Sequence, residues 1–247
     1  MAGKAKERLD KALVDRGLVQ SRQRAQAMIM AGKVLVDNMP VDKPGAQIKA
    51  GAEITVKEPD FPYVSRAALK LEKAVRTLDL SLEGMECLDV GASTGGFTDF
   101  MLQNGAKKVY AVDVGYGQIA WKLRQDPRVV VIERMNIRYM PADALEGPVD
   151  LVTIDTSFIS LKNVVPPTLD FVKPGGIYLA LIKPQFEVGK GKVGKGGIVR
   201  DPAQHEAVIA DLSEFFEGLG LVVGPVTPSP ITGTKGNREF IIKLVKP

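Results

Sequence analysis

The chain has 247 residues, of which 45% are hydrophobic and 25% are charged, the balance of a folded globular protein of one or two domains. This excludes a mostly disordered chain, a collagen-like repeat and a coiled-coil rod. One cysteine and one histidine exclude an internal disulfide and argue against Cys- or His-based metal sites and Ser-His-Asp catalysis, so we expect no metal. The N-terminus has no apolar signal region, and the longest apolar run, residues 177–182, is far too short for a membrane helix. A cytoplasmic protein is therefore the default expectation.

The net charge of +4 comes from one end of the chain. Residues 1–58 hold 11 Lys and Arg against 7 Asp and Glu, whereas the remainder holds 22 of each kind. An excess of positive charge at one end predicts a polyanionic partner there. A solvated basic surface would give the same count, so charge alone leaves both interpretations open.

The N-terminal segment predicts two short helices followed by small strands. The helices are expected over 7–15 and 22–31, and the strands over 33–37, near 41 and over 53–57. Gly17 and Gly32 follow the two helices, and Ser21 is a candidate N-cap of the second. Two prolines within 57–63 indicate a linker. We therefore predict a small α+β domain over residues 1–58, a linker over 59–64 and a second domain over 65–247.

From residue 65, predicted helices alternate with predicted strands. The strands are expected over 86–90, 108–113, 129–132, 149–155, 177–183, 221–226 and 238–244, and the helices over 66–78, 97–104, 117–124, 161–172 and 202–218. This alternation predicts an α/β domain, a doubly wound parallel sheet with helices on both faces. Trp121, Phe215 and Phe216 fall at helical positions and are expected in the core.

The strongest local signal is residues 87–97, where an apolar strand leads through a glycine turn into a helix. Small residues there let a ligand approach the backbone at the carboxyl end of the strand. The glycine spacing is not G-x-G-x-x-G, which disfavours a nicotinamide or flavin dinucleotide. Asp113 ends the next strand, where a carboxylate can accept both ribose hydroxyls of a nucleoside, and Asn136 follows the third. Together they predict a nucleoside cofactor without a pyrophosphate, such as S-adenosylmethionine, although any α/β sheet needs glycines in its first turn.

Charged residues also stand at the ends of predicted strands. Asp155 and Lys183 each close an apolar strand, and the carboxyl ends of parallel strands gather at the ligand crevice. Burial and nearby positive charge favour the neutral form of a lysine, so Lys183 is a candidate general base. Each charge taken singly is most simply a surface charge. Their placement at strand ends favours a functional role for Asp155 and Lys183, but it gives little support for such a role at Lys70 and Glu239.

Seven segments together resemble the TlyA family of rRNA methyltransferases, also called the hemolysin A family, and the resemblance covers essentially the whole chain. The segments are residues 89–99, 113–118, 126–129, 133–138, 157–161, 182–187 and 235–239. The N-terminal part resembles the RNA-binding domain shared by ribosomal protein S-four and pseudouridine synthases. That resemblance implies that rRNA is the partner, and that Arg8, Arg22, Arg24 and Lys33 contact it. Arg66, at the start of the second domain, is a further candidate RNA contact.

The C-terminal part resembles the FtsJ-like 2′-O-methyltransferases, which implies a Rossmann-like sheet and S-adenosylmethionine as cofactor. It implies a catalytic tetrad of Lys70, Asp155, Lys183 and Glu239, in which Lys183 takes the proton of a ribose 2′-hydroxyl. Asp155 and Lys70 would orient the hydroxyl and tune Lys183, and Glu239 would hold the lysines. The implied cofactor residues are Gly91, Ser93, Gly95, Phe97, Asp113, Asn136 and Asp155. One departure is alanine at 67 and 68, where members often have glycines, and alanine suits a helix.

The expected function is therefore 2′-O-methylation of cytidine in rRNA. A membrane-acting hemolysin is one alternative, which the absence of a spanning or long amphipathic segment disfavours. A non-catalytic ribosome-binding assembly factor is another, but such a protein could lose the tetrad, and here all four positions are filled. The short N-terminus resembles the family's shorter subgroup, whose members act on large-subunit rRNA only, so we lean towards that target.

Overall fold

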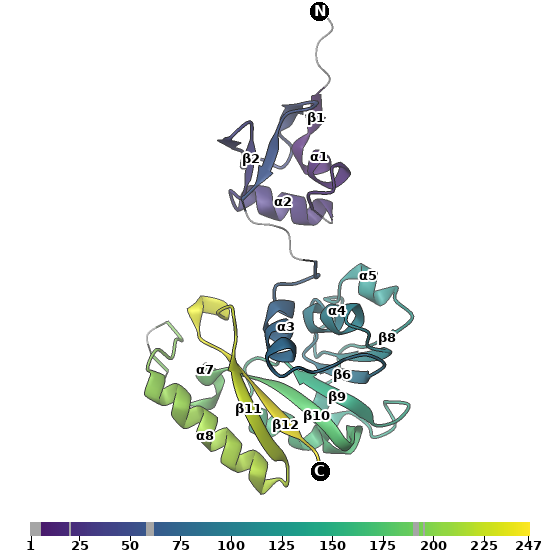
Figure 1. Cartoon of the computed structure of the whole chain (residues 1–247), viewed down its shortest axis with the longest axis vertical. Helices are drawn as coiled ribbons and strands as arrows, with labels where there is room; N and C mark the ends of the chain where they lie inside the picture. Colours follow the sequence, from purple (N-terminus) through teal and green to yellow (C-terminus); the bar gives the residue numbers. More distant parts are fainter. Residues whose placement is uncertain (1–5, 20, 58–61, 190–192, 195) are drawn as a thin grey trace, which may run out of the picture. The chain divides into compact units, whose positions relative to one another are not determined.

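The computed structural model describes residues 6–19, 21–57, 62–189, 193–194 and 196–247. The chain divides into two compact units, Met1–Pro62 and Tyr63–Pro247, and each is described by itself (Figure 1). Among the described residues, none of the helices combines the length and apolar character that crossing a membrane requires.

The linker that we predict over 59–64 falls only partly on described residues, because 59–61 lie outside them. Tyr63 and Val64 pack on the second unit. The Tyr63 ring contacts the ring of Phe100, and the Val64 amide donates a hydrogen bond of 2.7 Å to Asp99 Oδ2. In the structure, the second unit therefore starts before residue 65.

The first unit has the expected α+β composition. Two helices, α1 (Leu9–Asp15) and α2 (Arg22–Met30), share one buried cluster with a three-stranded antiparallel sheet. The sheet contains β2 (Val34–Val36), β3 (Met39–Pro40) and β5 (Ile54–Val56). Leu9, Leu13 and Ile29 lie at the centre of the cluster. The predicted cap of α2 is confirmed, because the Ser21 hydroxyl accepts a hydrogen bond of 3.3 Å from the Arg24 amide.

One strand pair of the first unit was not predicted. Strands β1 (Lys6–Arg8) and β4 (Gln47–Lys49) pair antiparallel, so the helix expected from residue 7 begins at Leu9 instead. Lys, Glu and Arg are good helix formers, and the local sequence therefore favours a helix. The pairing with residues far along the chain decides for a strand.

The second unit contains a seven-stranded sheet in the order β11-β12-β10-β9-β6-β7-β8. The strands are β6 (Glu86–Val90), β7 (Lys108–Val112), β8 (Val129–Ile132), β9 (Val149–Ile154), β10 (Val172–Ile182), β11 (Val222–Pro228) and β12 (Phe240–Val245). The doubly wound α/β fold is confirmed, but the expectation of an all-parallel sheet is wrong for β12, which runs antiparallel to both β10 and β11. A parallel return would need a crossover of a dozen or more residues, usually a helix, and the connection over residues 229–239 contains only one 3₁₀ turn.

Helices cover both faces of this sheet (Figure 1). They are α3 (Ala68–Thr77), α4 (Gly96–Gln103), α5 (Trp121–Arg124), α6 (Leu161–Val164), α7 (Pro184–Glu187) and α8 (Pro202–Gly218), with the 3₁₀ turns η1 (Ile137–Tyr139), η2 (Pro166–Phe171) and η3 (Thr234–Gly236). The helix expected over 161–172 is divided at Pro166, because a proline in a helix interior removes a hydrogen bond and clashes with the preceding turn.

The prediction that Trp121 lies in the core is wrong. Its side chain is 71% exposed at the start of α5, which is only one turn long. Gly117 has a φ of +68°, so residues 117–120 do not continue the helix that the sequence pattern indicates. Phe216 is fully buried and Phe215 packs against the same core, as expected.

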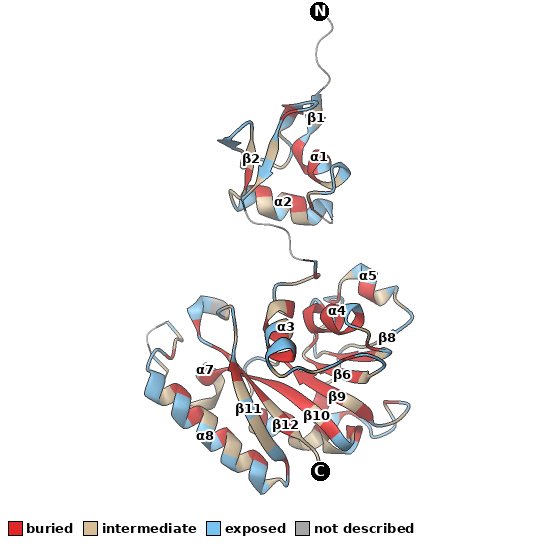
Figure 2. Cartoon of the chain, viewed as in Figure 1, coloured by how far each residue is buried: buried red, intermediate tan, exposed pale blue. Residues whose placement is uncertain are grey.

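The main core lies between the sheet and helices α6 and α8. It includes Leu88, Val152 and Tyr178 from the strands and Leu212 from α8. Figure 2 shows that the central strands are largely buried, as is helix α4. The strand order reverses between β6 and β9, which are neighbours in the sheet. In doubly wound sheets, ligands bind beyond the carboxyl ends of the strands at this reversal.

Candidate active site

A cavity of about 490 Å³ opens at this reversal point. Its walls come from the turns that follow β6, β9 and β10, from the start of α3 and from the loop that precedes β12. Among the residues that line it are Lys70, Asp155, Lys183 and Glu239, together with Gly91, Ser93 and Phe97 of the predicted cofactor set. The structure therefore brings the four tetrad positions and part of the predicted cofactor site to one cavity.

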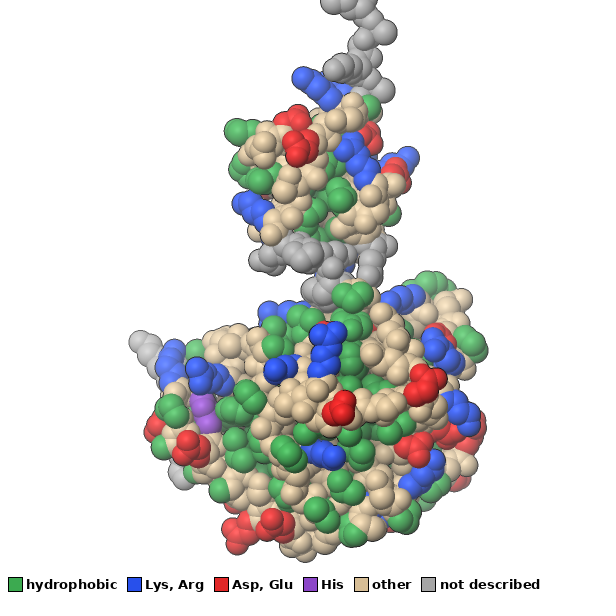
Figure 3. Space-filling model, in the orientation of Figure 1, with side chains coloured by type: hydrophobic (Ala, Val, Ile, Leu, Met, Phe, Trp, Pro, Cys, Tyr) green, Lys and Arg blue, Asp and Glu red, His purple; other side chains and the backbone are tan. Residues whose placement is uncertain are grey.

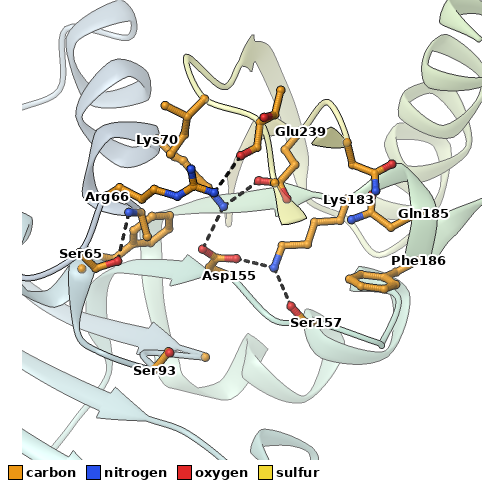
Figure 4. Close-up of a pocket in the computed structure, with 18 of the residues that line it drawn as sticks. Ser65, Arg66, Lys70, Ser93, Asp155, Ser157, Lys183, Gln185, Phe186 and Glu239 are labelled. Atoms are coloured by element: carbon orange, nitrogen blue, oxygen red, sulfur yellow. Dashed lines mark hydrogen bonds and ion pairs between the residues drawn. The ribbon is translucent and has the colours of Figure 1, made fainter. Parts of the chain in front are cut away.

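The four tetrad side chains form a continuous chain of ion pairs (Figure 4). Lys183 Nζ lies 2.5 Å from Asp155 Oδ1, and Lys70 Nζ lies 3.5 Å from Asp155 Oδ2. Lys70 Nζ also lies 2.7 Å from Glu239 Oε2. The side chains of Lys70, Asp155, Lys183 and Glu239 are only 10%, 15%, 9% and 3% exposed. Two cations and two carboxylates balance one another, as buried charges require.

The backbone explains how these distant residues meet. Asp155 follows β9, and Lys183 follows β10, the parallel neighbour of β9. Glu239 precedes β12, and the antiparallel register pairs Ile182 with Phe240, which brings Glu239 to the same edge as Lys183. Gly233 leaves room for the Glu239 carboxylate, because a Cβ at this position would overlap Glu239 Oε1.

The glycine turn after β6 packs directly on the peptide that follows β9. Gly91 has a φ of +84°, and a Cβ added to it would lie 2.8 Å from the carbonyl oxygen of Asp155. Gly95, with a φ of +91°, begins helix α4 in a left-handed conformation. Both positions therefore need glycine, one for close backbone approach and the other for conformation.

The predicted ribose-binding carboxylate, Asp113, does not line the cavity but holds the turn beside it. Asp113 Oδ2 accepts a hydrogen bond of 2.8 Å from the Ser93 amide, and its Oδ1 accepts one of 2.7 Å from the Gly115 amide. Asn136 also lies away from the cavity lining. Its Oδ1 caps η1 by accepting a hydrogen bond of 3.1 Å from the Arg138 amide.

Asp89 is a carboxyl that the sequence analysis did not single out. It lies at the floor of the cavity, fully buried, and accepts hydrogen bonds from the hydroxyls of Thr98 (2.6 Å) and Thr153 (3.0 Å). Burial raises the pKa of Asp89 to about 6, against the opposing effect of the two hydroxyls. A charged residue within an otherwise apolar strand was the available signal.

Other residues that line the cavity belong to the segments that carry the family resemblance, and the sequence analysis assigned them no individual role. The Ser157 hydroxyl lies 3.0 Å from Lys183 Nζ. Phe158 is 90% exposed with a φ of +64°, and its ring lies 5.0 Å from that of Phe186. Gln185 Oε1 is buried and accepts no hydrogen bond from the described residues. The cavity therefore offers an unused polar acceptor and an exposed aromatic ring.

The predicted RNA-contacting residues occur in both units. In the first unit, Arg8 and Arg22 both bind the fully buried carboxylate of Asp10, over 3.0 and 2.9 Å. Arg24 lies in the first turn of α2, and Lys33 precedes β2. In the second unit, exposed Arg66 lines the cavity, where its guanidinium lies 3.5 Å from the carbonyl oxygen of Thr232. Within the described ranges, no three His, Cys, Asp or Glu side chains are grouped so that they could hold a metal ion.

Comparison with known proteins identifies the family of this chain. The chain matches the models described as FtsJ-like methyltransferase, over residues 63–246, and S4 domain, over residues 7–54. It is 45% identical over 238 residues to the Mycobacterium tuberculosis protein named 16S/23S rRNA (cytidine-2′-O)-methyltransferase TlyA, covering 96% of this chain and 89% of that protein. It is 50% identical over 240 residues to the Bacillus subtilis protein named "Putative rRNA methyltransferase YqxC", covering 97% and 85%. A solved structure described as "Putative hemolysin from Streptococcus thermophilus" matches with a TM-score of 0.77 at 46% identity, covering 99% of this chain and 90% of that one.

The fold and the matched models define a methyltransferase of the S-adenosylmethionine-dependent class, joined to an S4 domain. The chain belongs to the FtsJ-like methyltransferase family, in the TlyA, or hemolysin A, group that the seven sequence segments indicate. The resemblance on which the sequence analysis relies is therefore confirmed.

Proposed function

We propose that this protein transfers a methyl group from S-adenosylmethionine to the ribose 2′-hydroxyl of a cytidine in rRNA, which its first unit helps to bind. The observation that carries the proposal is the buried chain of ion pairs from Lys183 through Asp155 and Lys70 to Glu239. The cytidine and the rRNA come from the name of the 45% identical relative.

The residues around the glycine turn fit a nucleoside cofactor. Gly91 and Gly95 remove side chains where a ligand must approach the backbone, and Gln185 Oε1 offers a buried acceptor in the same cavity. Asp113 is half-buried beside Ser93, where a carboxylate can also accept ribose hydroxyls. Asn136, like Asp113, lies outside the cavity lining, and its contact with the cofactor stays a prediction. When bound, S-adenosylmethionine supplies an electrophilic methyl group.

The side chains at the carboxyl edge can activate a hydroxyl. After Lys183 Nζ gives up one proton of its ion pair with Asp155, it accepts the proton of the ribose 2′-hydroxyl and later releases it to solvent. Asp155 and Ser157 both contact Lys183 Nζ and fix its position. Lys70 holds Asp155 from the other side and is itself held by Glu239. Much of the rate would come from holding the hydroxyl oxygen in line with the methyl group.

The mouth of the cavity suits a nucleotide taken out of its helix. A base that leaves its stack needs an aromatic or apolar surface in exchange, and Phe158 presents one next to Phe186. Arg66 at the rim supplies a cation for the RNA backbone.

The test is methyl transfer from labelled S-adenosylmethionine to isolated small and large ribosomal subunits. We compare the wild type with Lys183→Ala and with Lys73→Ala, which removes an exposed lysine from the same unit. The proposal expects label on a cytidine 2′-oxygen with the wild type and Lys73→Ala, and none with Lys183→Ala. The labelled subunit identifies the target. From the sequence we expect the large subunit.

Absence of transfer by a wild-type protein that binds both cofactor and subunit would contradict the proposal. It would favour the non-catalytic assembly factor, because binding would then remain without chemistry. Full activity of Lys183→Ala would contradict the role of Lys183 while leaving the reaction itself intact.

A further inference from the structure

A second cavity, of about 430 Å³, adjoins the candidate active site and has no part in the proposed chemistry. It is lined by residues of the segment 198–202, by His205 in α8 and by residues of the segment 235–238. Lys235 lines both cavities, so the two are neighbours at this side chain. An RNA chain whose nucleotide enters the active site would pass close to the second cavity.

The charged groups of the second cavity all have one sign. Arg200, Lys235 and Arg238 line it, and its described lining contains no carboxylate. No ion pair joins these three cations to an acidic side chain within the described part of the protein. The nearby Asp201 carboxylate is engaged elsewhere, because its Oδ1 accepts a hydrogen bond of 3.0 Å from the Ala203 amide at the start of α8. Figure 3 shows Lys and Arg side chains beside the one histidine of the chain.

Two buried polar side chains hold the segment that carries Arg200 in place. Asn237, 2% exposed, accepts a hydrogen bond of 3.0 Å from the Val199 amide and donates one of 2.9 Å to the Gly197 carbonyl. His205, 5% exposed, lies with Nε2 3.0 Å from the Val199 carbonyl oxygen. A carbonyl only accepts, so His205 Nε2 carries the hydrogen. Asn237 holds the segment with Arg200 against the segment with Lys235 and Arg238, and His205 holds the segment with Arg200 against α8.

We propose that this cavity binds a phosphodiester of the RNA, next to the nucleotide whose ribose enters the active site. The identity of the ligand rests on the proposed function. Guanidinium groups match the two free oxygens of a phosphate, and unpaired cations at an open surface contribute affinity through counterion release. A small-molecule anion would gain more from an enclosed site, whereas this cavity is open to solvent and can admit a continuing chain.

The test compares two double variants that lose the same net charge. Arg200→Gln/Arg238→Gln removes two cations from the second cavity. Arg76→Gln/Lys107→Gln removes two exposed cations at the other edge of the sheet, because Arg76 is near the end of α3 and Lys107 precedes β7. For each full-length protein we measure the Kd for the ribosomal subunit, its dependence on salt, the Kd for S-adenosylmethionine, the melting temperature and the kinetics of methyl transfer.

We expect Arg200→Gln/Arg238→Gln to weaken subunit binding roughly tenfold and to lower the slope of log Kd against log salt by about 1. Its kcat, cofactor affinity and melting temperature should match those of Arg76→Gln/Lys107→Gln. Equal subunit affinity and equal salt slope for the two double variants would overturn the inference. A lower kcat or cofactor affinity with unchanged RNA binding would overturn it too, because the arginines would then act on the active site.

The two proposals fail in different ways. If the wild type binds the subunit but transfers no methyl group, the proposed function fails. The Kd for the ribosomal subunit and its salt dependence still test the phosphate cavity, because a weaker Kd with a lower salt slope does not require catalysis.

Discussion

Lys70 Nζ and Glu239 Oε2 lie 2.7 Å apart, and this ion pair joins the first turn of helix α3 to the residue that precedes strand β12. The pair is almost completely buried and contacts Asp155 only through Lys70. Glu239 therefore acts on the chemistry at a distance, by keeping Lys70 in place.

The first prediction separates the charge of Glu239 from its packing. Glu239→Gln leaves the buried Lys70 with one carboxylate fewer. Breaking a buried ion pair typically lowers the free energy of unfolding by roughly 3–5 kcal/mol, and we expect a loss at or below the lower end of this range. We expect lower stability in urea unfolding and a strongly reduced kcat. In Lys70→Met/Glu239→Gln both charges are gone, so stability should return while activity does not. A double variant as unstable as the sum of the single variants would contradict this account.

The second prediction concerns Phe158, whose ring is exposed beside Phe186 and whose φ of +64° is unfavourable for a residue with a Cβ. Stacking of one base on an aromatic ring contributes roughly 1–3 kcal/mol. We expect Phe158→Ala to raise the KM for RNA accordingly, with cofactor affinity unchanged. Phe158→Gly should unfold at an equal or higher temperature than Phe158→Ala, because glycine accepts the left-handed conformation. If Phe158→Leu retains wild-type KM, apolar contact rather than stacking is what the site uses.

The third prediction follows from the pKa of Asp89, raised from 3.8 to about 6 by burial. The folded protein holds this proton at pH values where the unfolded chain has lost it. Its contribution to stability is therefore complete below about pH 4 and is lost as the pH rises through about 6. The shift corresponds to roughly 3 kcal/mol at neutral pH.

Asp89→Asn stays neutral at every pH, which isolates this contribution. We expect its free energy of unfolding, relative to the wild type, to rise between about pH 4 and about pH 7. Urea unfolding of both proteins across this range measures the difference, and other titrating groups cancel. A constant difference would mean that Asp89 ionises in the folded protein as it does in the unfolded chain.

The fourth prediction concerns Asp10, whose fully buried carboxylate accepts hydrogen bonds from Arg8, Arg22 and Gln26. The hydrogen bond from Arg8 is the largest cause that holds the pKa of Asp10 well below its usual range. Stability gained from the ionised form is therefore present above the unfolded pKa and lost as the pH falls towards the folded one.

Asp10→Asn tests whether this carboxylate positions the two arginines for RNA. The substitution makes the chain more positive, and on net charge alone RNA would bind more tightly. Positioning predicts the opposite, because the two guanidinium groups lose their common anchor. Asp15→Asn, at an exposed position of the same helix, is the charge-matched control. Tighter RNA binding by both variants would contradict the positioning role.

Much of this arrangement could be predicted from sequence, because strand ends and glycine turns are local signals. The strand that ends before Asp155 and the turn at Gly91 were expected from apolar runs and small residues alone. Lys70 and Glu239 were not, since nothing local distinguishes them from surface charges. Only the family resemblance singled them out, and their convergence depends on α3 and β12 meeting at one edge.

The errors have the same physical origin. An all-parallel sheet would place the start of the last strand, and with it Glu239, at the edge away from Lys183. The antiparallel direction of β12 is a long-range property of the sheet and leaves no mark on the sequence of the strand. Trp121 fits a helical pattern that Gly117 interrupts. The cofactor contact of Asn136 is not one of these errors and stays a prediction, although its side chain caps its own backbone, as asparagine often does at a helix start.

The contact of Gly91 with the Asp155 peptide sets a fixed spacing between the two halves of the active site. The turn next to the proposed methyl donor and the carboxylate next to the proposed acceptor touch through backbone atoms, without an intervening side chain that could change its rotamer. In Gly91→Ala, the added methyl group would clash with the Asp155 carbonyl oxygen and push the two strand ends apart. We expect such a protein to fold and to bind each substrate, yet to hold them too far apart to react.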